Sequence, residues 1–234
     1  MSWLQDPAKT AANYATESNL RARQALYEEV DGKPAHDVLR QAIAARRPQR
    51  VLEVGGGPGE LAGWMHDQLG AEIAYLDLSP RMVELARERG VAARQGDVQD
   101  LPFADGSFDT VVAAWMLYHV PDLERGLSEI SRVLVPGGAL IAVTNSVEHL
   151  QELRTLMHYT RAAEPFSREN GEQLLSPHFS TVARHDIDGK VTVRRREQLV
   201  GYQQSIPVAT RSIPDDVELP FVTWTRVSIF VATK

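Results

Sequence analysis

Three carboxylates and one imidazole in this sequence could do chemistry together: Glu53, Asp77, Asp97 and His119. Each lies in or just after a run of apolar residues of the kind that forms a buried strand. Carboxylates accept hydrogen bonds from hydroxyl and amino groups. A neutral imidazole, with an ordinary pKa of about 6.5, can accept a proton at cellular pH. These residue types suit a nucleoside-like ligand with a proton transfer beside it.

Glu53 precedes a turn over residues 55–59 in which four of the five positions are glycine. The turn joins an apolar run over residues 51–54 to a helical pattern that begins at Glu60. Glycine allows positive φ and lacks the Cβ that would hold a ligand away. A strand, a glycine turn and a helix N-terminus together form a nucleotide-sized cradle with free amide groups. The turn therefore predicts where a ligand binds, but it leaves the ligand open.

A dinucleotide is one candidate ligand. Residues 57–62 fit its fingerprint, G-x-G-x-x-G/A, and Asp77 lies about 20 residues downstream, as that fingerprint expects. An NAD(P)-dependent oxidoreductase is therefore an alternative function. A carboxylate at Glu53 would be poorly placed beside a pyrophosphate, whereas it is acceptable beside a cationic group. This contrast favours a positively charged nucleoside.

These residues lie in an alternation of strands and helices that begins at residue 50. The expected strands cover 51–54, 72–76, 91–95, 110–114 and 139–144, and the expected helices cover 61–69, 80–88 and 123–134. Such an alternation predicts an α/β fold in which helices cover both faces of a parallel sheet. Ligands of open parallel sheets bind beyond the carboxyl ends of the strands. We therefore expect the acidic residues to meet at that edge.

The flanking segments follow a different pattern. Short helices are expected within residues 1–30 and over 34–46, and further helices over 147–163, 168–175 and 197–205. An extended segment over 181–193, broken at Asp188-Gly189, and a closing strand over 221–232 complete the pattern. We interpret residues 1–234 as a single domain, with an N-terminal helical arm (1–47), a cofactor-binding core (48–145) and a substrate-side insert with closing strands (146–234).

Composition narrows the function classes. With 234 residues, 43% of them hydrophobic, the chain can bury one sizeable core. It has no cysteine, which excludes disulfides, thiolate metal sites and cysteine nucleophiles, and its seven histidines lack the close pairs of zinc sites, so no metal is expected. The net charge of −6 argues against a nucleic-acid partner. The N-terminal residues do not resemble a signal peptide, and no apolar run approaches the roughly 20 residues of a membrane span. We expect a soluble cytoplasmic monomer or homodimer with no membrane partner.

The motifs as a set resemble the class I S-adenosylmethionine-dependent methyltransferases, especially the small-molecule (type 11) group related to ubiquinone and menaquinone biosynthesis enzymes. The family's first motif, E/D-x-G-x-G-x-G, is matched by Glu53, Gly55, Gly57 and Gly59. Four further matches follow in order, at residues 75–79, 96–103, 107–112 and 134–140. The resemblance implies S-adenosylmethionine as cofactor. It also implies a Rossmann-like, doubly wound, mostly parallel seven-stranded sheet, with a helical insert after the fifth strand.

The resemblance also implies roles for individual residues. Asp77 would accept hydrogen bonds from the ribose hydroxyls and Asp97 from the adenine amine, while Leu78 and Met82 would pack against the purine. Glu53 would face the sulfonium and the ammonium group. The expected cofactor-binding residues are Tyr14, Glu53, Gly55, Gly57, Gly59, Asp77, Leu78, Met82, Asp97, Val98, Ala114 and Trp115.

The expected reaction is methyl transfer to an oxygen, nitrogen or carbon of a small organic molecule by in-line displacement (EC 2.1.1). Trp115, Tyr118 and His119 are the expected substrate-binding residues. His119 is the candidate general base; the alternative is that it caps the following helix or bonds a backbone carbonyl. Asp109 is interpreted as structural. Arg21 and Arg23 are interpreted as a solvated helix face, with pairing to the cofactor carboxylate as the alternative.

Overall fold

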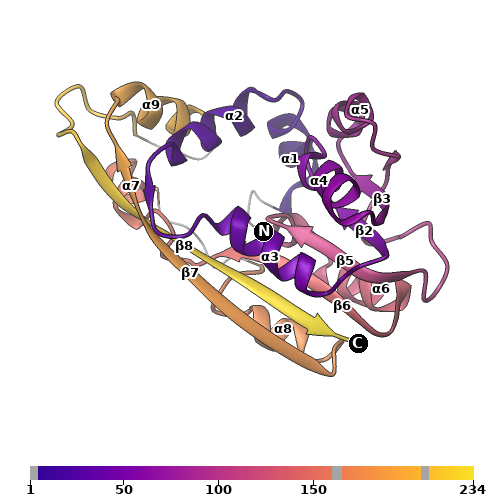
Figure 1. The fold of residues 1–234 in the computed structure, drawn as a ribbon. Helices are drawn as coiled ribbons and strands as arrows, with labels where there is room; N and C mark the ends of the chain where they lie inside the picture. Colours follow the sequence, from indigo (N-terminus) through magenta and orange to yellow (C-terminus); the bar gives the residue numbers. More distant parts are fainter. Residues whose placement is uncertain (1–4, 160–164, 207–210) are drawn as a thin grey trace.

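The apolar runs of the sequence become the central strands of a sheet in this computed structural model, which describes residues 5–159, 165–206 and 211–234 (Figure 1). Five strands lie side by side in parallel, in the spatial order β4-β3-β2-β5-β6. Their bounds are Arg50–Val54 for β2, Glu72–Asp77 for β3, Ala93–Gln95 for β4, Phe108–Ala114 for β5 and Leu134–Asn145 for β6. Residues 51–54 are all buried, as a central strand between two helical layers requires.

The other strands extend this sheet at the β6 side. Strand β8 (Phe221–Thr233) lies between β6 and β7 (Thr181–Val193) and runs antiparallel to both. A two-residue strand, β1 (Val30–Asp31), pairs with the outer edge of β7. The predicted Rossmann-like, doubly wound sheet is confirmed. It has eight strands rather than seven, because the end of the N-terminal arm adds β1 to the edge.

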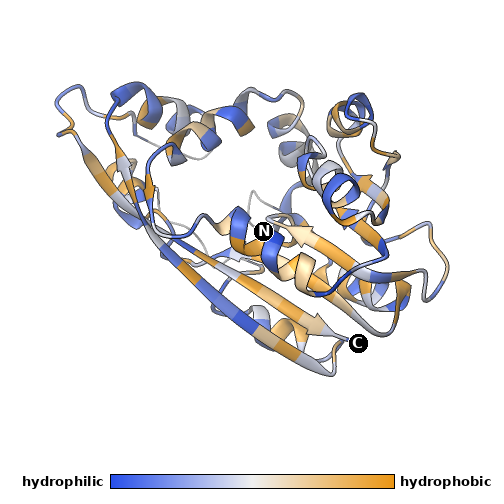
Figure 2. Cartoon of the chain, in the orientation of Figure 1, coloured by the Kyte–Doolittle hydropathy of each residue, from blue (hydrophilic) through white to orange (hydrophobic). Residues whose placement is uncertain are grey.

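Helices cover the sheet, among them α3 (Ala35–Ala45), α4 (Glu60–Leu69), α5 (Pro80–Glu88) and α6 (Leu123–Val133). Leu39 of α3 and Met65 of α4 pack on one face, and Leu127 of α6 packs on the other. Figure 2 shows the hydrophobic colour concentrated along the central strands, with hydrophilic stretches on the helices. Within the part of the chain that the structure describes, no helix has the length and apolar character of a membrane span.

Two predicted elements differ in the structure. The helix expected over 147–163 is only α7 (Gln151–Leu156), since Leu150 has a left-handed backbone (φ 53°) and its N–H donates to the Trp224 carbonyl in β8. Residues 160–164 of that prediction lie outside the described residues. The break expected at Asp188-Gly189 does not occur, because Gly189 keeps its pairing with Thr225 and β7 continues. The helices expected over 168–175 and 197–205 are α8 (Gly171–Leu175) and α9 (Arg196–Gln204).

The N-terminal arm contacts both α5 of the central α/β part and α9 near the C-terminal end of the chain. Its helices are α1 (Pro7–Asn13) and α2 (Ser18–Gln24), followed by the 3-10 turn η2 (Ala25–Tyr27). At one end, the Gln198 side chain of α9 donates to the Ala25 carbonyl at 2.8 Å. At the other end, Arg81 of α5 pairs with Glu17 at 3.0 Å. In Figure 1, α2 accordingly lies between α9 and α5 along the top of the view.

Candidate functional site

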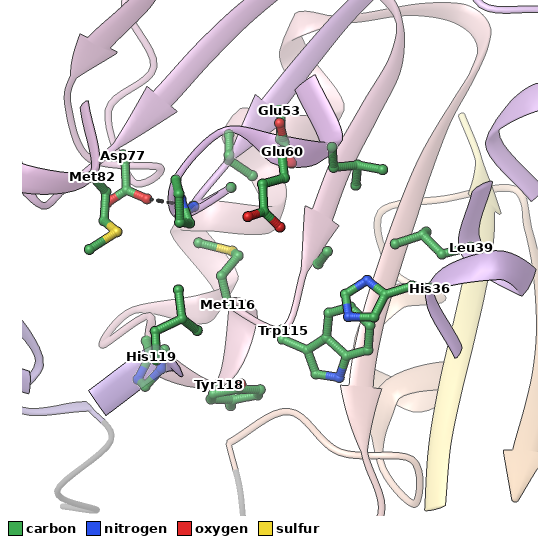
Figure 3. Close-up of a pocket in the computed structure, with 18 of the residues that line it drawn as sticks. His36, Leu39, Glu53, Glu60, Asp77, Met82, Trp115, Met116, Tyr118 and His119 are labelled. Atoms are coloured by element: carbon green, nitrogen blue, oxygen red, sulfur yellow. Dashed lines mark hydrogen bonds between the residues drawn. The ribbon is translucent and has the colours of Figure 1, made fainter. Parts of the chain in front are cut away.

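A cavity of about 960 Å³ lies at the carboxyl ends of β2, β3 and β5, beside the N-terminal arm (Figure 3). In Figure 3, Asp77 and Met82 lie on one side of it, and His36 with Trp115 on the other. The predicted site residues that line it are Tyr14, Glu53, Gly55, Gly57, Asp77, Leu78, Met82, Asp97, Val98, Ala114, Trp115, Tyr118 and His119. Gly59 is not among its lining residues.

The glycine turn brings the backbone close to the cavity. The backbone is left-handed at Gly55, Gly57 and Gly59, with φ values of 63°, 59° and 81°. A Cβ on Gly57 would meet no atom within 4 Å, so this position faces open space. A Cβ on Gly55 would lie 2.8 Å from Met116, and one on Gly59 would lie 2.8 Å from Ala86 of α5. Gly59 is therefore needed for close packing between the turn and α5, which explains its absence from the cavity wall.

A substitution at Gly56 tests how tightly the turn packs against the buried acid behind it. A Cβ there would lie 2.4 Å from the Glu53 carboxyl carbon and 2.7 Å from the Tyr75 ring. Because both neighbours are buried, we expect Gly56→Ala to lower the free energy of unfolding by about 1–3 kcal/mol. Gly63→Ala in α4, where a Cβ meets no atom within 4 Å, should raise it by roughly 0.5–1 kcal/mol. Urea unfolding of both variants checks this, and an equal change in the two would contradict it.

Glu53 is a buried carboxylate with unused hydrogen-bonding capacity. It is 1% exposed, and among the described residues its Oε2 atom has no hydrogen-bond partner. Burial, and second the charge of Asp77, raise the pKa of Glu53 to about 8, although the backbone N–H of Ala62 donates to it. A buried carboxylate is costly unless a positive charge compensates it. On the cavity wall, its ionised form therefore suits a cationic ligand group, such as an ammonium or a sulfonium, better than a pyrophosphate.

Asp77 is oriented by backbone groups at the end of β3. Its Oδ1 atom accepts from the Ser79 N–H at 2.8 Å, and its Oδ2 atom accepts from the Gly57 N–H at 3.3 Å (Figure 3). The Tyr75 hydroxyl lies 3.3 Å from Oδ2, but its single proton has a shorter contact with the Gly57 carbonyl oxygen. A carboxylate has about four acceptor sites. Two of them therefore remain for the neighbouring hydroxyls of a ribose. Burial raises the pKa of Asp77, against these backbone hydrogen bonds.

Asp97 is oriented by a side chain that the sequence analysis missed. The Gln99 N–H donates to Asp97 Oδ1 at 2.9 Å, and Gln99 Nε2 lies 2.8 Å from Oδ2 and 3.0 Å from Oδ1. Gln99 in turn accepts from the Asp122 N–H at 2.9 Å, which fixes its amide. These contacts leave room on the Asp97 carboxylate for one further donor, such as an amine in the cavity.

Trp115 forms the opposite wall and has a strained backbone. Its φ is 54°, a left-handed conformation that is rare for a bulky residue. The indole N–H donates to Asn145 at 3.2 Å, and the ring lies 4.7 Å from the His36 ring, between centroids. Burial, and next the charge of Arg40, lower the pKa of His36, which favours its neutral form. Trp115 is therefore held in one orientation by two residues from elements far apart in the sequence.

His119 lies at the end of the 3-10 turn η3 (Leu117–His119), in contact with the N-terminal arm. Its Nε2 atom and the Tyr14 hydroxyl are hydrogen-bonded at 3.2 Å, and its ring packs edge-on against Tyr14 and Tyr118. The backbone of Tyr14 is held in place as well, since its carbonyl oxygen accepts a hydrogen bond from the Ser79 hydroxyl at 3.2 Å. His119 does not cap α6: the Asp122 side chain does, accepting from the Arg125 N–H at 3.1 Å.

The structure also shows the surroundings of three charged residues that the sequence singled out. Asp109 is structural, because its carboxylate accepts from the N–H groups of Gln49 and Arg50 at 3.0 and 2.7 Å. Arg21 is exposed and pairs with Glu17, as expected for a solvated face. The same interpretation is wrong for Arg23, which lines the cavity. The fold of the arm turns this side of α2 inward.

Several lining residues were not foreseen: His36, Met116, Gln99, Asn145, Tyr27 and His149. Met116 and Gln99 lie next to predicted motif residues, so proximity in sequence could have pointed to them. The other four come from segments without a motif. Within the described ranges there is no group of three or more histidine and acidic side chains that could hold a metal ion.

Comparison with known proteins shows which proteins the chain is similar to. Residues 52–142 match the model of a methyltransferase domain. The chain is 32% identical over 148 residues to the malonyl-(acyl-carrier protein) O-methyltransferase of Enterobacter lignolyticus, covering 62% of this chain and 54% of that protein. It is 37% identical over 105 residues to the demethylmenaquinone methyltransferase of Thermus thermophilus, covering 42% and 48%. The chain thus matches about half the length of each of these relatives.

A solved structure agrees in fold over most of the chain. It is described as an S-adenosylmethionine-dependent methyltransferase, possible histamine N-methyltransferase, from Thermotoga maritima. The two structures superpose with a TM-score of 0.56 at 25% identity, covering 86% of this chain and 90% of that one. Family and structure both imply S-adenosylmethionine as the cofactor, and the buried Glu53 carboxylate on the cavity wall fits it. The ordered motifs, the sheet order and these similarities relate the chain to the S-adenosylmethionine-dependent methyltransferases: residues 52–142 resemble a methyltransferase domain, and the fold agrees with that of the solved structure.

Proposed function

We propose that this chain transfers a methyl group from S-adenosylmethionine to an oxygen, nitrogen or carbon of a small organic molecule by in-line displacement. The observation that carries the proposal is the buried Glu53 carboxyl group, one oxygen of which has no hydrogen-bond partner among the described residues, behind a glycine turn that faces a large cavity. A nucleoside that carries a sulfonium and an ammonium group would use both features. When bound, S-adenosylmethionine supplies an electrophilic methyl group on a sulfonium.

The residues around the cavity divide the work of binding. Glu53 would compensate the positive charge, Asp77 would hold the ribose and Asp97 the adenine amine. Leu78 is 47% exposed although it is apolar, so it offers a surface for a purine face, and Met82, which is buried at the cavity wall, would pack against the purine beside it. Held in this way, the methyl carbon would point towards the acceptor. Such positioning contributes roughly 7–11 kcal/mol in favourable intramolecular models.

The pair of His119 and Tyr14 would remove the proton when the acceptor must lose one. The Tyr14 hydroxyl is in contact with the imidazole, so the proton of the acceptor would reach His119 either directly or through Tyr14, which would give its own proton to the imidazole as it takes the other. Trp115 and Tyr118 would bound the acceptor.

The chain would form one domain with three parts: a helical arm (1–47), a cofactor-binding core (48–145) and a substrate-side part (146–234). We expect no nucleic-acid partner.

The first experiment compares ligands by thermal stabilisation. S-adenosylhomocysteine at 100 times its Kd should stabilise the protein by about 2.7 kcal/mol, because it binds only the folded state. NADH at the same concentration should leave the melting temperature unchanged. The comparisons with known proteins give no support to an oxidoreductase, and stabilisation by NADH alone would overturn the proposal. Transfer of label from the cofactor into a cell extract, followed by mass spectrometry, then identifies the methylated product.

A further inference from the structure

The large cavity has a side chamber on the side away from the glycine turn. This chamber has a volume of about 110 Å³, and Tyr14, Tyr118 and His119 line both spaces. A molecule in the side chamber therefore contacts the residues proposed to remove the proton. Its other lining residues include Tyr27 of the N-terminal arm, Tyr159 of the segment that follows α7, and Tyr202 of α9.

The two spaces differ in charge. The carboxylates Glu53, Asp77 and Asp97 lie on the cofactor side of the large cavity. The side chamber has no carboxylate among its described lining residues, and it has two arginines: Arg154, and Arg23, which it shares with the large cavity. Such a lining attracts negative charge and repels positive charge.

Arg23 has the geometry of an anion-binding residue. Its Nε and Nη2 atoms donate to two neutral oxygens, the Asn19 carbonyl at 3.2 Å and the Asn13 side chain at 2.9 Å. Its guanidinium lies 5.2 Å from the centre of the Tyr14 ring. Within the described residues no carboxylate pairs with it, in contrast to Arg21, which pairs with Glu17. A guanidinium has five N–H donors, so Arg23 can donate to a ligand without breaking these contacts.

The tyrosines add donors and flat surfaces. Five of the six tyrosines of the chain line this small space. At Tyr27 the direction of donation follows from its neighbour: His149 Nδ1 accepts from the Arg226 N–H at 3.0 Å, so in a neutral imidazole Nε2 carries the proton. That proton is donated to the Tyr27 oxygen at 2.9 Å. Donors and aromatic faces together suit a planar group with acceptor oxygens.

We propose that the methyl acceptor is a small aromatic acid, whose carboxylate binds in the side chamber beside Arg23 while its reactive atom lies next to His119. This inference rests on the proposed methyl transfer and specifies its substrate class. The aromatic ring lies against the tyrosines, and the positive charge of Arg23 disfavours an ammonium group in the position of the carboxylate.

Matched ring compounds test the inference by binding alone. 4-Hydroxybenzoate, 4-hydroxybenzamide and tyramine carry an anionic, a neutral and a cationic group on similar rings. Titration calorimetry with the protein saturated by S-adenosylhomocysteine should give the acid a Kd at least tenfold lower than that of the amide, with tyramine the weakest. An amide or amine that binds as tightly as the acid would overturn the inference, and so would a lack of binding by all three.

Variants of α2 show whether Arg23 is responsible for the preference for the acid. Arg23→Gln should reduce the preference for the acid over the amide to less than threefold, and Arg23→Lys should restore part of it. Arg21→Gln removes the same charge from the exposed side of the helix and should keep the full preference. An unchanged preference in Arg23→Gln contradicts the inference. The same titrations without S-adenosylhomocysteine separate the two proposals: a preference for the acid in a protein that does not bind the cofactor would support the chamber and reject methyl transfer.

Discussion

His119→Ala lowers the turnover of methyl transfer by about 10²–10⁴-fold, the usual contribution of a positioned general base, when the acceptor loses a proton in the reaction. The affinity for S-adenosylhomocysteine changes little, because the cofactor contacts proposed for Glu53, Asp77 and Asp97 do not involve the imidazole. Initial rates with the acceptor identified from the labelling experiment, together with calorimetry of cofactor binding, measure both quantities.

Two further variants show whether the loss of turnover in His119→Ala comes from the removal of a general base. Tyr14→Phe keeps the aromatic ring but removes the hydrogen bond to His119, so we expect a smaller fall in turnover, about tenfold. His66→Ala removes an exposed histidine of α4 and should leave the rate unchanged. An equal rate in wild type and His119→Ala would remove His119 from the mechanism. A parallel loss of cofactor affinity would instead give it a structural role.

The sheet and the cofactor side of the site were predictable because their signals are local. The Ser79-Pro80 start of α5 lies where the sequence places it, since the Ser79 hydroxyl accepts from the Met82 N–H and proline suits the first helical turn. The acids at strand ends followed from the rule that parallel strands bring their carboxyl ends to one edge. Local motifs and one topological rule were therefore enough to predict the sheet and the positions of these acids.

The acceptor side was not predictable, because long-range contacts decide it. Strand β7 runs through Gly189 since thirteen consecutive residues pair with β8, which outweighs a turn signal of two residues. Arg23 turns inward because α2 is held at both ends, by α5 and by the region of α9. Trp115 adopts its left-handed backbone where the Val143 carbonyl and the Asn145 side chain accept its two N–H groups. None of these partners is within a few residues of the position it controls.

Glu53→Gln is expected to have two effects. It should weaken the binding of S-adenosylmethionine, and it should remove part of the pH dependence of the free energy of unfolding. The pKa of Glu53 is raised to about 8 in the folded protein, against a reference value of 4.5. Its contribution to stability is therefore fully present below pH 4.5 and is lost as the pH rises through 8. Over this range the free energy of unfolding of wild type should fall, through Glu53, by up to about 1.4 kcal/mol per pH unit. Glu53→Gln should lack this contribution, whereas Glu72→Gln, at the exposed start of β3, should keep it.

The same carboxylate couples cofactor binding to proton release. At pH 7 most of the free protein carries a proton on Glu53, and a cation beside it favours the ionised form. Binding of S-adenosylmethionine should then release nearly one proton in wild type and in Glu72→Gln, but almost none in Glu53→Gln, whose affinity should fall at least tenfold. Calorimetry in buffers of different ionisation enthalpy counts these protons. Equal release by Glu53→Gln and wild type would mean that the cationic part of the cofactor does not reach Glu53, and the charge argument that favours a methyl donor over a dinucleotide would fail.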